Sequence, residues 1–335
     1  MGSLGRSGAS TPVPIASVAK VMTAYLTLRE HPLDVGEDGF TMTVTPGDSE
    51  EQERRESAGQ STLEVRAGER ITERQAIEAL LLPSANNIAA MLAVHEAGGS
   101  AAFVARMNAT AKTLGMSSTT YTDPSGFDPS TVSTAVDQLK LAQVVMRDPA
   151  FASIVDEPSA ELPLVGMVVN YNGLVGEDGY VGVKTGSDRA AGGCLVFAKH
   201  VRIAARTLTV LGVVLGQREG SLIDAALASA RRLGDSAAAA VRVQTAIPAG
   251  ASVLTATATG GQRTTVVTYS ALRELGWAGL AFPVEVATRQ KMTQLRAGEG
   301  FATVTVRGVR AVTIEAVARR SLVGPSLGWR LAHLL

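Results

Sequence analysis

A serine and a lysine three residues apart interrupt an apolar run near the start of the chain. The run reads "PIASVAKVMTAYL" over residues 14–26, and its apolar positions recur with helical spacing. Residues i and i+3 share a helix face, so Ser17 and Lys20 should lie one turn apart. A serine hydroxyl needs a base to take its proton, and a lysine becomes a base when burial or nearby positive charge lowers its pKa. The pair is therefore a candidate nucleophile and general base.

Two later tripeptides offer complementary chemistry, although each is a weak signal alone. "LLPSANNIAAML" places Ser84 and Asn86 at a turn between apolar helical segments, where a hydroxyl can relay a proton and an amide can hold a substrate amide. "GYVGVKTGSDRAAGGCLVF" places Lys184 and Thr185 before an apolar strand, where they can bind a carboxylate, and Gly186 permits close backbone approach. The order S-x-x-K, S-x-N, K-T-G is typical of penicillin-binding proteins and class A β-lactamases.

Over residues 12 to about 235 the chain resembles the D-alanyl-D-alanine carboxypeptidases, which are low-molecular-mass penicillin-binding proteins. Beyond the three motifs, the segments "FVARMNATAKTLGM", "TDPSGFD", "STAVD" and "AGGCLVFA" have counterparts in this family. The resemblance implies a serine peptidase that removes the last D-alanine from peptidoglycan stem peptides and binds β-lactam antibiotics covalently. It implies no cofactor.

The resemblance also implies a role for each matching residue. Ser17 would be the acylated nucleophile, Lys20 its general base, and Ser84 the relay that protonates the leaving D-alanine. The backbone N–H groups of Ser17 and Ser187 would form the oxyanion hole. The expected substrate-binding residues are Asn86, Lys184, Thr185, Gly186 and Ser187.

The sequence departs from the family pattern at a few positions. About sixteen residues precede Ser17, where the family has a β-hairpin, so one or two edge strands are expected to be missing. Asn87 stands where the family often has Asp, and Phe127 where it often has Leu. Ser187 replaces bulkier residues, with little expected loss because its contribution would be a backbone donor.

Two alternative functions remain open at this point. A β-lactamase needs a carboxylate between the second and third motifs, and Asp156, Glu157 and Glu161 lie there. However, the "E-x-x-L-N" pattern is absent, and β-lactamases rarely carry an additional β domain. A catalytically idle wall-binding protein is the other alternative, although the intact motifs argue against it. Reactivity of Ser17 with a penicillin discriminates among the three.

The element pattern predicts an α+β fold of the β-lactamase/transpeptidase type, with an antiparallel sheet, helices on both sides and a helical subdomain. Helices are expected over residues 14–30 and in "TERQAIEALLL", "TAVDQLKLAQVVM" and "SLIDAALASARRL", whereas the charged "GDSEEQERRES" is expected to be a solvated loop. The predicted domains are a catalytic domain at 1–238, a small all-β domain at 239–322 and a tail at 323–335.

Composition restricts the possible partners and environment. The 31 basic and 31 acidic residues balance, so no nucleic-acid partner is expected, and the four histidines lack metal-ligand spacing, so no metal is expected. The single cysteine, Cys194, excludes an intrachain disulfide and should be a buried packing residue. The resemblance implies an extracytoplasmic, cell-envelope location, with the leader absent from this chain.

The charge balance hides an asymmetry between the two parts of the chain. From Ser236 onward, eleven Lys/Arg face four Asp/Glu, so the C-terminal domain is a candidate for docking on an anionic membrane or wall surface. The final "GPSLGWRLAHLL" could direct Trp329 and its neighbouring leucines, Leu327, Leu331 and Leu334, towards lipid. The same leucines could equally pack on the β domain.

Overall fold

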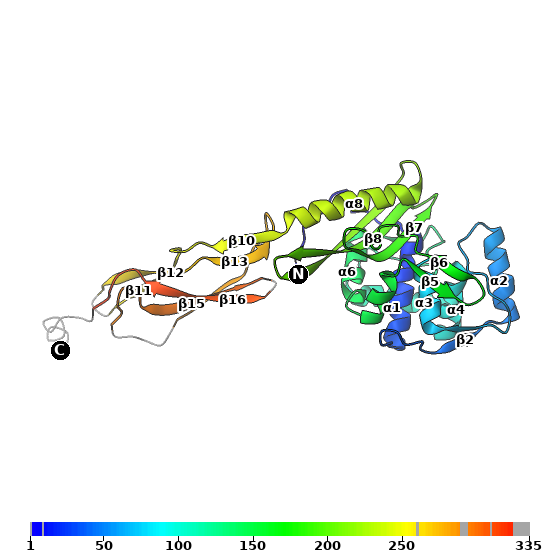
Figure 1. Ribbon diagram of the computed structural model, residues 1–335, viewed down its shortest axis with the longest axis horizontal. Coiled ribbons are helices and arrows are strands. Elements are labelled where there is room, and N and C mark those ends of the chain that lie inside the picture. Colours follow the sequence, from blue (N-terminus) through cyan, green and yellow to red (C-terminus); the bar gives the residue numbers. More distant parts are fainter. Residues whose placement is uncertain (1, 9, 259–260, 289–293, 309, 324–335) are drawn as a thin grey trace. The chain divides into compact units, whose positions relative to one another are not determined.

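The computed structural model describes residues 2–8, 10–258, 261–288, 294–308 and 310–323 (Figure 1). Internal contacts divide the chain into two compact units. The larger unit is Ser7–Ala238, and the second combines Met1–Arg6 with Ala239–Leu335. The candidate site residues Ser17, Lys20, Ser84, Asn86 and Lys184–Ser187 all belong to the larger unit.

The larger unit is built on a three-stranded antiparallel sheet of order β7-β8-β9. Its strands are β7 (Tyr180–Asp188), β8 (Gly192–Ile203) and β9 (Arg206–Gln217). The central strand β8 is buried on both faces, which explains why its sequence is almost continuously apolar. Cys194 and Val196 belong to the main core, whereas Leu195 and Phe197 pack with helix α8 (Leu222–Ala240). Cys194 is therefore a buried free thiol, as predicted.

Helices cover both faces of this sheet, as the predicted fold class requires. Helix α1 (Lys20–Glu30) runs through the main core and contacts five other helices. Helix α6 packs against β8 and β9 and α7 against β7, while α8 lies on the opposite face. The helices other than α1 and α8 are α2 (Pro46–Ser57), α3 (Glu73–Leu81), α4 (Asn86–Ala97), α5 (Ser100–Thr113), α6 (Ala135–Val145) and α7 (Pro149–Val155).

Short strand pairs complete the larger unit. They pair β1 with β4, β2 with β3, and β5 with β6, all antiparallel. The strands are β1 (Val13–Pro14), β2 (Thr41–Thr43), β3 (Arg70–Thr72), β4 (Val132–Ser133), β5 (Ser159–Leu162) and β6 (Gly166–Val169).

Two sequence-based expectations in this unit were wrong. The helix expected over 14–30 begins only at Lys20, because Pro14 pairs in β1 and a 3₁₀ turn, η1 (Ala16–Ala19), comes between them. The charged stretch expected to be a loop is helix α2, which starts with a capping box between Thr45 and Asp48. Only Gln52 of α2 is buried, so the helix has no apolar stripe that periodicity could reveal.

The C-terminal unit is all-β, as predicted. Its main sheet is antiparallel with five strands in the order β11-β12-β16-β15-β14, and β10 pairs separately with β13. Val266, Val304 and Ala316 lie in its small core, in strands whose burial alternates along the chain. The strands are β10 (Arg242–Ile247), β11 (Ser252–Thr257), β12 (Arg263–Thr268), β13 (Leu272–Gly276), β14 (Val284–Thr288), β15 (Gly300–Arg307) and β16 (Ala311–Ala318).

The predicted lipid-facing residues Leu327, Trp329, Leu331 and Leu334 lie outside the described residues. Within the described ranges, no single helix is long and apolar enough to cross a membrane. Helices α4 and α5 pass that test only as a pair, by length and composition, with an 85° bend between them.

Candidate active site

Ser17 and Lys20 meet at the junction between η1 and α1. Ser17 lies in the 3₁₀ turn and is half-buried, whereas Lys20 is the first residue of α1 and is fully buried. The Lys20 Nζ lies 2.8 Å from the Ser17 Oγ. The 3₁₀ turn thus brings the two side chains into the contact that the sequence predicted for an α-helix.

Two further oxygen atoms surround the Lys20 nitrogen. Nζ donates to Asn86 Oδ1 over 2.6 Å and to the Ser125 backbone carbonyl over 3.1 Å. A carbonyl oxygen can only accept a hydrogen bond, so both groups require an N–H from the lysine. A neutral amine has two N–H donors and one lone pair. With both donors used, the lone pair is left for the Ser17 hydroxyl, which is the arrangement that proton abstraction requires.

The surroundings of Lys20 favour its neutral form. Burial is the largest cause that lowers the Lys20 pKa well below its ordinary value. The positive charge of Lys184 lowers this pKa further, the negative charge of Asp123 opposes the shift, and Arg55 contributes a smaller lowering. The three oxygen atoms that Lys20 contacts carry no formal charge, so they do not offset the effect of burial as a carboxylate in contact would.

The backbone before Ser17 is held in an unusual conformation. Ala16 has φ +46°, in the left-handed region that alanine rarely adopts. Two glycines allow this turn to be packed from both sides. A Cβ on Gly126 would lie 1.9 Å from the Ala16 carbonyl oxygen, and a Cβ on Gly186 would lie 3.0 Å from the Ser17 nitrogen. Gly186 therefore brings strand β7 directly against the backbone of Ser17.

The third motif lies on β7, opposite β8 in the sheet. Lys184 pairs in register with Val196, and both Lys184 and Thr185 are buried. The Lys184 Nζ has no hydrogen-bond partner in the described part of the chain, and burial lowers the Lys184 pKa to about 7. A buried amine without a partner is costly and is suited to receiving a substrate carboxylate. Ser187 follows Gly186 and is half-buried.

The second motif lies in the turn between α3 and α4. Ser84 has φ +69°, and its buried Oγ lacks a hydrogen-bond partner among the described residues. Asn86 is the first residue of α4, and its Nδ2 donates to Gln60 Oε1 over 2.8 Å. Asn87 accepts from the Leu63 N–H and donates to the Leu63 carbonyl, each over 2.9 Å. The side-chain amide of Asn87 thus satisfies both the backbone N–H and the backbone carbonyl of Leu63.

The structure joins Ser17, Lys20 and Asn86 directly and places Gly186 against the Ser17 backbone. Ser84, Lys184 and Thr185 are also buried, but no hydrogen bond joins the side chain of any of them to Ser17. Sequence reasoning did not assign a role to the Ser125 carbonyl, to Gln60 or to Asp123. The Asp123 carboxylate accepts hydrogen bonds from the Ser125 N–H, the Ser125 Oγ and the Thr131 Oγ1. These bonds fix the turn that carries the Ser125 carbonyl. The segment "TDPSGFD" contains this loop, but a backbone carbonyl leaves no signature in sequence.

Comparison with known proteins agrees with this geometry. The family model described as Peptidase S11, D-alanyl-D-alanine carboxypeptidase, matches residues 4–218. The chain belongs to this family. The D-alanyl-D-alanine carboxypeptidase DacB2 of Mycobacterium tuberculosis is 38% identical over 185 residues, which are 53% of this chain and 59% of that protein. A D-alanyl-D-alanine endopeptidase of Escherichia coli is 34% identical and covers 55% of this chain and 58% of its own length. The chain thus spans less than two thirds of these relatives.

Solved structures of the same fold extend this comparison. The Streptomyces K15 DD-transpeptidase aligns with a TM-score of 0.61 at 28% identity, over 70% of this chain and 92% of its own. Penicillin-binding protein 5 from Haemophilus influenzae aligns with a TM-score of 0.65 over 96% of this chain and 93% of its own. At 17% identity the latter shows the fold alone, and its alignment includes the C-terminal β region of this S11 family member.

Of the three carboxylates considered for a β-lactamase, Glu157 is paired with an arginine. Glu157 forms an ion pair with Arg74 over 2.5 Å, and Arg74 also pairs with Glu78 over 2.7 Å. Glu161 lies on strand β5, where it is exposed. Burial raises the Asp156 pKa, with the charge of His200 opposing the shift. The structure gives none of these groups a contact with Ser17 or Lys20.

Proposed function

We propose that this chain is a serine D-alanyl-D-alanine carboxypeptidase that removes the terminal D-alanine from peptidoglycan stem peptides. The observation that carries the proposal is the 2.8 Å contact between Ser17 Oγ and the Nζ of a buried Lys20, whose other two hydrogen bonds go to uncharged carbonyl oxygens. Membership of the S11 family supports the substrate class. The relatives include a carboxypeptidase at 38% identity and an endopeptidase at 34%, so the assay described below separates removal of a terminal residue from cleavage of cross-links.

In this mechanism Lys20 takes the hydroxyl proton as Ser17 Oγ attacks the carbonyl carbon between the two D-alanines. The N–H groups of Ser17 and Ser187 stabilise the oxyanion, and Lys184 with Thr185 binds the terminal carboxylate. The C–N bond then breaks, and the proton that Lys20 took passes through the Ser84 hydroxyl to the leaving amine of D-alanine, which leaves Lys20 neutral again. Water hydrolyses the remaining ester and regenerates the Ser17 hydroxyl.

A β-lactam is expected to follow the same route as far as the acyl-enzyme. Its strained amide replaces the scissile bond, and its carboxylate matches the group that Lys184 and Thr185 would bind. The opened ring stays attached and blocks water, so the adduct on Ser17 should persist for minutes or longer. Glu157 is one carboxylate that could activate the water that hydrolyses the acyl-enzyme. Its ion pair with Arg74 engages this carboxylate, which supports slow hydrolysis of the adduct.

Mass spectrometry after exposure to a penicillin tests this proposal, together with an assay for free D-alanine. We expect an adduct of the full penicillin mass on the peptide containing Ser17, and its loss in Ser17→Ala. A peptide ending in D-Ala-D-Ala should release D-alanine, whereas one ending in L-Ala-L-Ala should not. Rapid penicillin turnover would instead identify a β-lactamase. Absence of adduct, turnover and D-alanine would identify an idle scaffold, and cleavage of cross-linked dimers alone would identify an endopeptidase.

We also propose that the protein works outside the cytoplasm, in the cell envelope, and that its C-terminal β region docks on an anionic membrane or wall surface. Eleven basic residues against four acidic ones from Ser236 onward support this. Arg319 and Arg320, at the end of β16, are both exposed. Each suitably placed basic residue adds about 1 kcal/mol of attraction to an anionic surface.

Co-sedimentation with phosphatidylglycerol vesicles at low salt tests this docking. We expect the double variant Arg319→Glu/Arg320→Glu to lose most of the binding. The matched control Lys112→Glu/Arg202→Glu reverses two exposed charges on the larger unit and should bind like the unchanged protein. Equal losses in both variants, or no binding by the unchanged protein, would contradict a specific role for the C-terminal region.

A further inference from the structure

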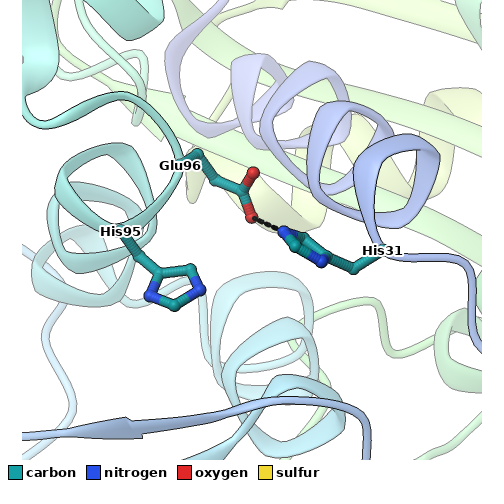
Figure 2. A group of neighbouring side chains, drawn as sticks. All are labelled: His31, His95 and Glu96. Carbon is teal, nitrogen blue, oxygen red and sulfur yellow. Dashed lines mark ion pairs between the residues drawn. The ribbon is translucent and has the colours of Figure 1, made fainter.

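A second cluster of chemically active side chains lies at the opposite end of α1 from Lys20. His31 caps the C-terminus of α1, and His95 and Glu96 lie in the last turn of α4. One nitrogen of each imidazole and one carboxylate oxygen all lie within 4.8 Å of one another. Figure 2 shows the carboxylate of Glu96 pointing towards the His31 ring, with the His95 ring beside the same space. Sequence spacing could not reveal the cluster, because 64 residues separate His31 from His95.

The carboxylate of Glu96 lacks a strong partner. Its side chain is 1% exposed, and its Oε1 has no hydrogen-bond partner in the described part of the chain. The His31 Nε2 lies 3.6 Å from this oxygen. Arg106 lies close by, but its guanidinium donates to the Glu96 backbone carbonyl and to Glu30. A buried carboxylate with so little compensation is costly in its charged form, and a bound cation would relieve that cost.

We propose that His31, His95 and Glu96 bind one divalent transition-metal ion, with zinc the best match to their chemistry. Two imidazoles and one carboxylate are a donor set that zinc accepts, leaving a fourth position for water. Calcium and magnesium prefer oxygen donors and should not compete. Zinc ligands stand about 2.0–2.2 Å from the ion, so the three donors must draw together by roughly 1.5 Å. His31, 41% exposed, has the freedom to make that movement.

The wall of this site is already formed. Phe40 stacks on the His95 ring, with centroids 4.2 Å apart and planes 20° from parallel. The Phe40 ring also meets the His31 ring edge-on, with centroids 4.9 Å apart. Phe40 thus restricts the His95 ring on one side, which lowers the entropy lost when a metal fixes that ring. Ring contacts of this kind also occur without a metal, so the buried carboxylate, rather than the stacking, carries the inference.

The position of the site suggests what a bound ion would do. Helices α1 and α4 begin at Lys20 and Asn86, which share a hydrogen bond, and they end at the residues of the cluster. An ion there would join the far ends of the two helices whose first residues form the candidate active site. Lys20 and His31 are eleven residues apart, about 16 Å along a helix, so the ion would stabilise the fold without touching the substrate.

Isothermal titration of the full chain, stripped with EDTA and dialysed, tests the proposal with zinc chloride as the probe. We expect one zinc per chain, and a rise in Tm of about 5 °C at a hundredfold excess over Kd. Cobalt(II) in place of zinc should give the visible absorption of a four-coordinate ion. His95→Gln and Glu96→Gln should each weaken zinc binding at least tenfold. The matched control His200→Gln removes an exposed histidine elsewhere and should bind normally.

Circular dichroism of each metal-free variant shows whether it is folded, so a loss of binding by a folded variant supports the site. Zinc binding of equal strength in the unchanged protein and in the double variant His95→Gln/Glu96→Gln would overturn the proposal. So would the absence of saturable binding to the unchanged protein, which would leave His31 and Glu96 as an ion pair only. Neither result depends on whether the chain is a carboxypeptidase.

Discussion

Lys20 and Asn86 are the first residues of α1 and α4, and 2.6 Å separates the Lys20 Nζ from the Asn86 Oδ1. This bond joins two helices that meet at the candidate nucleophile. Because the acceptor is an uncharged amide, it orients the lysine without stabilising its protonated form as strongly as a carboxylate would. The contrast between an amide and a carboxylate at position 86 can be tested directly.

Asn86→Asp should raise the pKa of Lys20, because a negative charge in contact with the amine favours the ammonium form. Acylation requires the neutral amine, so the acidic limb of the rate profile should move upward by at least about one pH unit. The measurement is the second-order rate of penicillin acylation between pH 5 and 10. Asn86→Leu removes the acceptor without adding charge, and its acidic limb should not move upward. Parallel profiles for Asn86→Asp and the unchanged protein would refute this account of Lys20.

Gly126→Ala should be far more harmful than an ordinary glycine substitution. Gly126 has φ +79°, and a Cβ there would lie 1.9 Å from the Ala16 carbonyl oxygen, next to Ser17. Gly115→Ala is the matched control, because Gly115 has φ +70° with nothing within 4 Å of the added Cβ. Urea unfolding should show a loss of about 1 kcal/mol for Gly115→Ala. It should show more than about 3 kcal/mol for Gly126→Ala, whose penicillin acylation should also fall. Similar losses in the two variants would mean that the Ala16 turn tolerates displacement.

Ser84→Ala should separate activity from stability. The buried Ser84 Oγ has no hydrogen-bond partner among the described residues, so its removal breaks no bond, and alanine meets the same backbone strain at φ +69°. We expect the free energy of unfolding to change by less than about 0.5 kcal/mol. The rate of D-alanine release should fall by about 100-fold or more, because the leaving amine loses its proton relay. A large loss of stability with activity retained would give Ser84 a structural role instead.

The parts of this site that depend on side-chain type could be predicted from the sequence. The motif residues Ser17, Lys20 and Lys184 stand out because a hydroxyl and two amines interrupt apolar runs. The central strand β8 and the helix α8 could also be predicted. Burial of the strand leaves an apolar run in the sequence, and burial of one stripe of the helix leaves apolar residues at helical spacing.

The sequence did not predict the features of the site and fold that depend on backbone conformation and on contacts between residues far apart in the chain. Nothing in "PIASVAK" shows that Ala16 adopts a positive φ, because alanine rarely does so, and periodicity therefore extended the helix through Pro14. The Ser125 carbonyl that contacts Lys20 lies 105 residues away in sequence. Helix α2 was not predicted because only one of its residues is buried, which leaves no apolar periodicity. The cluster of His31 with His95 was not predicted because tertiary packing alone brings the two residues together.

Glu78→Gln should alter the pH dependence of stability. Burial raises the Glu78 pKa to about 7, with the charge of Glu157 adding to the shift and Arg74 opposing it. Between pH 4.5, the ordinary value, and pH 7, the folded state thus holds a proton that the unfolded state has lost. Stability from this group therefore falls as pH rises through that window. Glutamine cannot titrate, so urea unfolding at pH 5, 6 and 7 should give a flatter profile. Glu64→Gln, at an exposed carboxylate, is the control and should keep the original slope.

Lys20→Arg should almost abolish acylation although it preserves a positive charge. Arginine stays protonated at any accessible pH, so no lone pair would face the Ser17 hydroxyl. Its larger guanidinium must also fit where the lysine amine contacts Asn86 and the Ser125 carbonyl within 3.1 Å. We expect the rate of penicillin acylation to fall by a factor of about 10² to 10⁴, without recovery up to pH 10. Lys199→Arg is the control, because Lys199 is also buried but pairs with Asp235 on α8. Circular dichroism establishes that each variant is folded. A folded Lys20→Arg protein that keeps more than a tenth of the original rate would mean that another group takes the proton from Ser17.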